Sequence, residues 1–206
     1  MQIADVFYSL IRKFTDKNDF ILALWNELFK HYNSPKRYYH NLNHIYELLV
    51  YFVDYKHDIR NVEVLLFAIF YHDIIYDVLR KDNEEKSAVL AVKRMDELKI
   101  PKQDIDLCYN YILATKNHHV HKLDNDLAYF LDFDMAILGK SSEEYLKYTH
   151  QIRKEYAIFP DFMYRKGRKN VLESFLEKER IFISDTFYSL FEQQARENIY
   201  NELIAL

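Results

Sequence analysis

The amino-acid sequence predicts an all-α protein, and three observations lead to that prediction. Only two glycines and three prolines occur among the 206 residues, so long segments run without a residue that breaks helices. Apolar residues recur at spacings of three and four along most of the chain, as on one face of a helix. Half of the residues are hydrophobic and 17% are aromatic, which excludes a disordered chain. The scarcity of turn-forming residues also argues against a sandwich or barrel.

The N-terminal half is expected to form three helical segments. Residues 2–31 carry apolar side chains at helical spacings, up to a break at residues 34–35, where a serine precedes a proline. A second long helix follows from about residue 41 through residue 52. Residues 61–76 are apolar almost all round, which predicts a helix buried in the middle of the fold.

Capping signals mark the helices that follow. Asp82 and Glu85 have the spacing of a capping box and predict a helix start at that point. Pro101 suits the first turn of the next helix, because its missing N–H would have no partner there in any case. Ser141 and Glu144 predict the start of a further helix.

The last segment runs from residue 167 to the C-terminus and is expected to contain two helices, parted near residues 184–185. We find no linker, internal repeat or low-complexity tract. The sequence therefore predicts one domain over residues 1–206.

Composition also bounds the setting and the partners. The net charge of −4 argues against nucleic acid as a bulk electrostatic partner. The single cysteine, Cys108, cannot form an intramolecular disulfide, and we expect no signal peptide. The longest apolar run, residues 64–71, is far short of the ~20 residues of a membrane span. We expect a cytoplasmic protein without a membrane partner, while the oligomeric state is not indicated.

Histidines and aspartates at apolar positions carry the functional argument. His72 and Asp73 directly follow the apolar run, and a polar pair there is costly to bury unless it is satisfied. A bound cation would satisfy both members at once. Asp132 and Asp134 lie in a second apolar setting, residues 130–138.

Two further histidines, His40 and His44, are four residues apart. They share a face if one helix includes both. If Asn41 or Asn43 caps that helix instead, His40 precedes the first turn and can still point toward the same region.

Each of these residues also has an ordinary structural interpretation. A lone buried histidine is more often a hydrogen-bonded core residue than a ligand. Asp132 or Asp134 could cap a helix, and His118, His119 and His121 could belong to a polar loop. The order of a histidine, a His-Asp pair and a distant aspartate in a helical chain favours a metal site.

The pattern His44, His72-Asp73 and Asp134 resembles that of the HD-domain metal-dependent phosphohydrolases, a helical superfamily. The resemblance extends over most of the chain. Several segments are similar to one poorly characterised bacterial branch of the superfamily, whose members are described as predicted phosphohydrolases. The resemblance implies an HD-domain, PDEase-like helical bundle in which those four residues bind a divalent metal ion. Because the family places its last ligand second in a D-x-D segment, the resemblance favours Asp134 over Asp132. The segments that carry it are residues 39–44, 71–77, 83–88 and 152–156.

Residues 39–44 are also similar to the YHNxxH segment of cyclic-nucleotide phosphodiesterases, which share the HD core. That likeness implies that His40 is the general acid and His44 a metal ligand. In those enzymes another histidine follows the His-Asp pair by three positions, where this chain has Tyr76.

Two imidazoles and two carboxylates suit a divalent ion such as Mn, Fe, Ni, Zn or Mg, with positions left for water and substrate. Asp73 could bridge to a second ion, and His118 is the candidate for an additional ligand to it.

Other residues near this site are candidates for catalysis or substrate binding. Phosphate requires positive charge, which makes Arg37 the favoured candidate, followed by Arg153 and Arg168. Arg153 could equally be a surface charge. Asp77 and Glu84 could orient ligands or move a proton, or could be helix caps.

The sequence thus predicts hydrolysis of a phosphoester by a metal-activated water, with a small nucleotide or another phosphorylated metabolite as substrate. A different class of function is a non-catalytic sensor module that binds a nucleotide or a metal on the same core. The sequence retains every metal ligand of the HD core, which favours the enzyme over the sensor module. A structural or scaffolding protein is the third choice, since such a protein has no need for a His-Asp pair at the end of an apolar helix.

Overall fold

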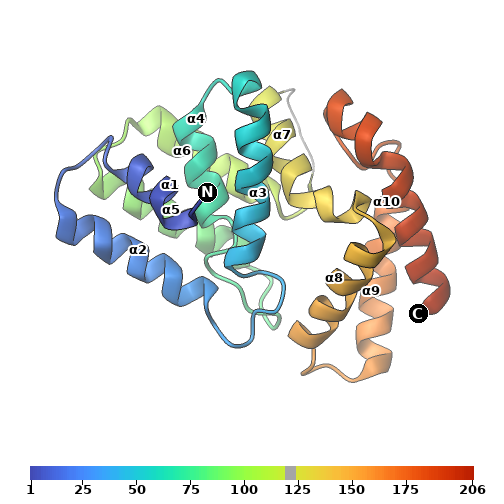
Figure 1. The fold of residues 1–206 in the computed structure, drawn as a ribbon. Coiled ribbons are helices and arrows are strands. Elements are labelled where there is room, and N and C mark those ends of the chain that lie inside the picture. Colours follow the sequence, from blue (N-terminus) through green and yellow to red (C-terminus); the bar gives the residue numbers. More distant parts are fainter. Residues whose placement is uncertain (119–123) are drawn as a thin grey trace. The chain divides into compact units, whose positions relative to one another are not determined.

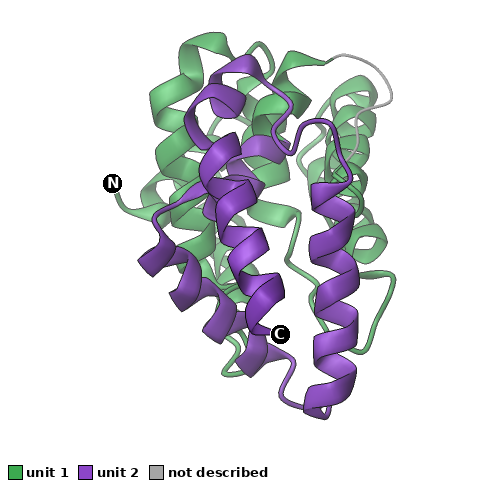
Figure 2. Ribbon diagram, turned by 90° about the vertical axis from the view of Figure 1, so that its right-hand side faces the viewer, with its two compact units in different colours: residues 1–130 green, residues 131–206 purple. Residues whose placement is uncertain are grey.

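The computed structural model describes residues 1–118 and 124–206, and within these ranges it contains helices and no strand (Figure 1). The all-α prediction is therefore confirmed for the described residues. His119 and His121 lie outside them. The chain divides into two compact units, Met1–Phe130 and Leu131–Leu206 (Figure 2). That division does not decide whether the units fold separately, so the single domain stays a prediction.

Unit 1 is built from consecutive helices joined by short connections. Its α-helices are α1 (Ile3–Ile11), α2 (Asn18–Tyr32), α3 (Leu42–Tyr55), α4 (Val62–Tyr71), α5 (Asn83–Glu97) and α6 (Lys102–Ala114), with the short 3-10 helix η1 (Lys56–Asp58) after α3. Helix α7 (Asn125–Met135) begins in unit 1 and continues across the division as one unbroken helix.

Helix α4 is the centre of unit 1. All of its residues from Val64 to Tyr71 are buried, as the apolar sequence predicts. It packs against α1, α3, α5 and α6, and rings from α1 reach it, with Phe7 edge-on to Phe70 at 5.1 Å between centroids (Figure 1). The helix ends at Tyr71, with His72 as its C-cap, five residues earlier than the sequence predicts.

The helical run expected over residues 2–31 is wrong as one element, because the chain turns between α1 and α2. The run of polar residues 15–19 interrupts the apolar period there. The last turn of α1 tightens, with the amides of Lys13 and Phe14 donating to carbonyls three residues back. The Thr15 hydroxyl then accepts from the Lys17 amide at 3.3 Å.

The capping signals are confirmed in position and only partly in mechanism. Helix α5 begins after Asp82, but this side chain makes no cap hydrogen bond; its carboxylate pairs with Lys86 at 2.9 Å. The capping box is therefore wrong, since Glu85 binds Lys116 instead. Ser141 does cap the helix that follows it, accepting from the Glu144 amide at 3.3 Å.

Unit 2 contains the 3-10 helix η2 (Ala136–Gly139) and the helices α8 (Ser142–Glu155), α9 (Asp161–Leu176) and α10 (Asp185–Ala205). Ser184 caps α10, which confirms the break near residues 184–185. Helix α9 begins six residues before Gly167, so that glycine lies within a helix and not at its start.

Helix α10 is held within unit 2 by buried polar side chains. Asn198 of α10 donates from its amide to the carbonyls of Leu138 and Lys140, at 2.9 and 2.8 Å. Glu192 accepts from the amides of Ile181 and Phe182. These contacts join α10 to η2 and to the segment that precedes α10.

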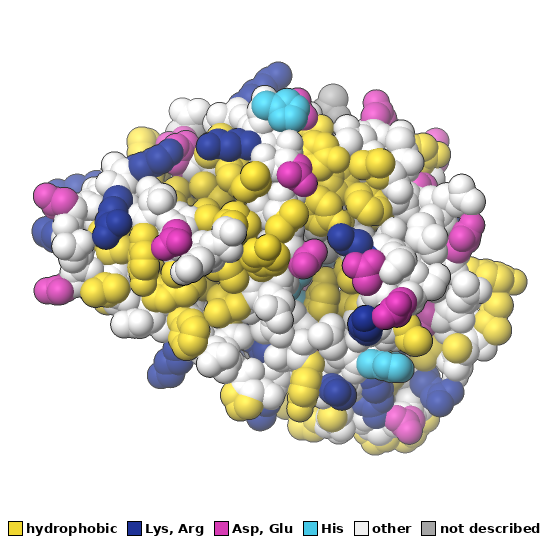
Figure 3. Space-filling model, in the orientation of Figure 1, with side chains coloured by type: hydrophobic (Ala, Val, Ile, Leu, Met, Phe, Trp, Pro, Cys, Tyr) yellow, Lys and Arg dark blue, Asp and Glu magenta, His cyan; other side chains and the backbone are white. Residues whose placement is uncertain are grey.

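Charged side chains of both signs are spread over the face of the molecule drawn in Figure 3, among apolar ones. No broad area of that face carries a single sign of charge. Among the helices that the structure describes, none is both long and apolar enough to cross a membrane.

The two glycines lie in opposite environments and give a matched pair of substitutions. A Cβ on Gly139 would lie 2.7 Å from the Phe191 carbonyl oxygen and 2.9 Å from its Cα, whereas nothing lies within 4 Å of one on Gly167. We expect Gly139→Ala to destabilise the protein by about 1–3 kcal/mol, because η2 must move off the backbone of α10. Gly167→Ala is expected to stabilise it by about 0.5–1 kcal/mol, because alanine favours an exposed helix interior.

Urea unfolding monitored by circular dichroism measures both changes. Equal effects of the two substitutions would contradict the close approach of η2 and α10.

Candidate metal centre

His72 occupies a defined tautomer at the end of α4. Its Nδ1 lies 2.9 Å from the carbonyl oxygen of Ile69, and a carbonyl can only accept, so Nδ1 carries the proton. The lone pair of the neutral ring is then on Nε2. Such a backbone hydrogen bond on the far nitrogen is the usual way in which proteins fix a metal-binding histidine. The side chain is 1% exposed.

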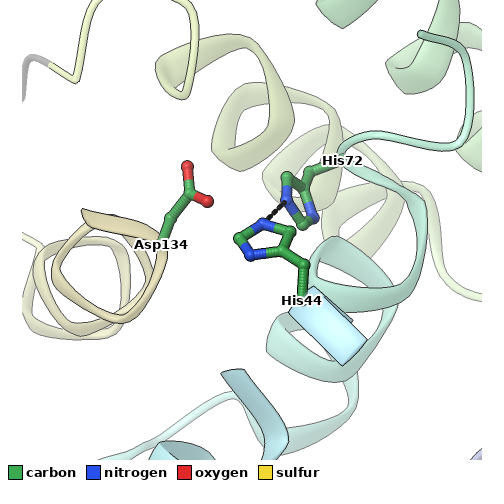
Figure 4. Close-up of side chains that lie close together, drawn as sticks. All are labelled: His44, His72 and Asp134. Carbon is green, nitrogen blue, oxygen red and sulfur yellow. Dashed lines mark hydrogen bonds between the residues drawn. The ribbon is translucent and has the colours of Figure 1, made fainter. Parts of the chain in front are cut away.

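His44 brings a second imidazole to the same place from the first turn of α3. Asn41 caps that helix, its side chain accepting from the Asn43 amide at 2.8 Å. The Nε2 atoms of His44 and His72 are 3.2 Å apart, and both side chains are buried (Figure 4). Two nitrogens at about 2.1 Å from one ion lie roughly 3.0–3.4 Å apart for bond angles of about 90–109°. The observed spacing is therefore that of a chelating pair.

Asp73 adds a carboxylate to this pair. Its Oδ2 atom is 3.2 Å from Nε2 of His72 and 3.8 Å from Nε2 of His44. The Asp73 side chain is 18% exposed, in contrast to the two buried histidines. Unit 1 thus supplies two nitrogens and one oxygen close together, all from residues that the sequence predicts as ligands.

Asp134 is the fourth predicted ligand and lies in the last turn of α7. Together with His44 and His72 it offers ligand atoms that all lie within 4.8 Å of one another (Figure 4). This group could hold a metal ion. No other group of three or more such residues stands out among the described parts of the chain, and His118 does not belong to this one.

The start of α7 is fixed within unit 1 by contacts that the sequence does not reveal. The buried carboxylate of Asp126 accepts from the backbone amides of Arg60 and Asn61, at 3.0 and 2.7 Å, just before α4 begins. Further along α7, the ring of Phe130 packs edge-on against His72 at 5.7 Å between centroids. Helix α7 is therefore held at both of these points beside the helix that ends in His72.

Asp132 has a different task from Asp134. Its two oxygens accept from the backbone amides of Ile183 and Ser184, at 2.7 and 2.8 Å, where α10 is about to begin. Burial raises the pKa of Asp132 to about 6, while the amide hydrogen bonds act in the opposite direction. Side chains two positions apart on a helix point about 200° apart, so only one of the two aspartates can face the histidines. The geometry agrees with the choice of Asp134.

His40 lies beside the histidine pair but outside it. Because Asn41 caps α3, His40 precedes the helix, as expected for a cap at that residue. Its ring is edge-on to that of His44 at 5.9 Å and stacks on Tyr76 at 4.2 Å. This position suits a proton donor next to a metal ligand; the acid role itself stays a prediction.

Arg37 is buried and uses its guanidinium on the backbone. It donates to the carbonyl oxygens of Asp73 at 2.7 Å, Ile74 at 2.8 Å and His40 at 3.2 Å. The expected contact with phosphate is therefore not the contact that the structure gives this side chain. It holds together the two segments that carry the site.

Two other expected catalytic residues make local turn contacts. Asp77 accepts from the Leu79 amide at 3.0 Å, as a turn-capping aspartate does, and its side chain is 49% exposed. Arg153 lies in unit 2 and donates to the carbonyl of Tyr156 at 3.0 Å and to Asp161 at 2.6 Å, which closes the turn between α8 and α9. Their catalytic roles stay predictions.

Two further candidates, His118 and Arg168, are also accounted for by local structure. His118 follows α6 with a positive φ of 46°, its amide bonded to the carbonyl of Ala114. Arg168 is buried in unit 2 and forms a two-pronged ion pair with Glu202 at 2.8 and 3.0 Å.

Comparison of the chain with protein-family models, with curated proteins and with solved structures found no match. Membership of the HD-domain superfamily and the HD-type bundle therefore stay predictions. The candidate centre rests on the geometry of the chain's own residues.

The histidine pair gives the first test of the centre. We expect the protein to bind about one equivalent of Mn²⁺, Ni²⁺ or Zn²⁺, and His44→Ala or His72→Ala to weaken binding at least 100-fold, because each removes one nitrogen ligand. His57→Ala is the matched control, since this histidine is 75% exposed. Isothermal titration measures affinity, and circular dichroism verifies the helical fold. Unchanged affinity in folded His72→Ala would contradict a metal centre.

The two aspartates of α7 give the second test. Asp134→Asn is expected to weaken metal binding with little loss of stability. Asp132→Asn should retain the metal but lose about 1–3 kcal/mol of stability, because its amide NH₂ would face a backbone N–H in a buried site. Metal titration and urea unfolding of both variants separate these effects. Loss of metal in Asp132→Asn with retention in Asp134→Asn would reverse the assignment.

Proposed function

We propose that this protein is a metal-dependent phosphohydrolase that uses His44, His72, Asp73 and Asp134 to bind a divalent ion. The observation that carries the proposal is the pair of buried Nε2 atoms 3.2 Å apart, with a carboxylate oxygen of Asp73 against both. A buried imidazole pair of this kind is costly unless a proton or a cation joins the rings. Carboxylates beside it favour the cation.

The ligand set suits Mn, Fe, Ni or Zn, with Mg less favoured because it prefers oxygen ligands only. When bound, such an ion lowers the pKa of a coordinated water and polarises a phosphoryl oxygen. The protein's part is to hold the ligands in place. The His72–Ile69 hydrogen bond orients one ring, and the Asn41 cap fixes the start of the helix that carries His44.

His40 is the proposed general acid. Its ring lies next to that of His44 without being part of the three-residue ligand group, so it can deliver a proton close to the ion. The proton would go to the oxygen that leaves phosphorus, while water adds on the opposite side. Half-burial of His40 leaves that proton accessible to a substrate arriving from solvent.

The proposed substrate class is a phosphoester of a small nucleotide or of another phosphorylated metabolite. A screen of the metal-loaded protein against phosphomonoesters, nucleotides and cyclic nucleotides tests it. Turnover that requires the metal and disappears in His72→Ala would support the proposal. Tight nucleotide binding without turnover would favour the alternative, a sensor module built on the same core.

The acid role of His40 predicts a dependence on the leaving group. His40→Gln is expected to lower turnover by about 10²–10⁴ for an alkyl phosphate, whose alkoxide needs a proton to leave. The loss should be much smaller for p-nitrophenyl phosphate, because its phenolate leaves without one. Steady-state rates on both substrates, with metal content measured in parallel, check this. Equal losses together with loss of metal would make His40 a ligand, and unchanged rates would make it a bystander.

A further inference from the structure

Tyr76 lies three residues after Asp73, in the segment between α4 and α5. Its ring is stacked on the imidazole of His40, with centroids 4.2 Å apart and planes inclined by 27°. Both side chains are half-buried, so each keeps some contact with solvent. Neither the ligand set nor the acid role of His40 accounts for this contact.

Arg37 contacts the Tyr76 ring of this stack. The guanidinium lies 5.5 Å from the Tyr76 ring centroid and 5.0 Å from that of Tyr32, and the arginine is 8% exposed. Its hydrogen bonds to the carbonyls of His40 and Asp73 join the two segments on which the stacked rings stand. Arg37 thus fixes the backbone of both segments relative to each other, and this places the Tyr76 ring against the His40 ring.

The other sides of the His40 ring are also bounded. The ring of Tyr39 is edge-on to it at 5.0 Å, and the ring of His44 is edge-on at 5.9 Å. Tyr76 covers one face of the ring. Removal of the Tyr76 ring would therefore take away the stacking contact that favours this plane of the imidazole, while the edge contacts remain.

We infer that Tyr76 is a positioning residue that holds the plane of the His40 imidazole for proton delivery. The inference rests on the proposed function, since orientation matters only if His40 gives up a proton. Transfer requires an approach of about 2.6–3.2 Å between heavy atoms along the N–H direction. A ring that rotates spends less time in that geometry, and a misplacement of about 1 Å can cost as much as 10² in rate.

Two substitutions at Tyr76 and one control test this positioning role. Tyr76→Leu removes the ring, Tyr76→Phe retains it, and Tyr55→Leu removes another stacked ring in unit 1, which pairs with Tyr129 at 5.6 Å. We expect Tyr76→Leu to lower turnover of an alkyl phosphate about 10- to 100-fold. Turnover of p-nitrophenyl phosphate and metal stoichiometry should stay unchanged. Tyr76→Phe and Tyr55→Leu should behave as the unsubstituted protein in the ratio of the two rates.

A second measurement does not depend on activity. The ring-proton resonances of His40 in the metal-free protein, assigned by their loss in His40→Gln, should shift downfield in Tyr76→Leu and stay in place in Tyr76→Phe. If the unsubstituted protein hydrolyses nothing, the proposed function fails, while the resonances still decide whether the Tyr76 ring lies on the face of His40 in solution. Unshifted resonances in Tyr76→Leu would overturn the inference. Equal rate losses on both substrates with loss of metal would also overturn it, since Tyr76 would then support the ligands.

Discussion

The burial of His72 at the end of α4 is the constraint on which the candidate site depends. An apolar helix surrounded by four others delivers a polar ring into the interior of unit 1, where its hydrogen-bonding capacity must be met. The Ile69 carbonyl meets the need of one nitrogen, which commits the other to face His44. The remaining features follow from this orientation: Asp73 is next in the chain, and α7 packs its Phe130 ring against the same imidazole.

Much of the fold could be predicted because its signals are local. Uninterrupted apolar residues predict α4, and Ser141 predicts the start of α8, since both depend on a few neighbouring side chains. The turn between α1 and α2 was missed because a short polar run ends a helix as effectively as proline does, without an equally clear signal. The capping box predicted from Asp82 and Glu85 does not form, because Lys86 and Lys116 bind the two carboxylates that would have capped the helix.

In the candidate site, too, what could be predicted depends on local signals, and what could not depends on contacts made only in the folded chain. The approach of His44 to His72 follows from a pattern of ligand-type residues and agrees with the geometry. The task of Arg37 could not be predicted, because it is set by carbonyls left without helical partners beyond the end of α4, and their positions exist only in the folded chain. Asp126 is a similar case: its partners are amides more than sixty residues away, which no spacing in the sequence reveals.

The unequal exposure of the ligands has a kinetic consequence. His44 and His72 are sealed on the side of the core, and freeing His72 by local unfolding would expose the eight buried residues from Val64 to Tyr71. Such an opening costs about as much as unfolding the whole unit. Among the proposed ligands, Asp73 and Asp134 are the partly exposed ones. An ion would therefore enter and leave past the carboxylates, with the histidines as the last contacts to break, and its residence time would be set by side-chain motion at the surface.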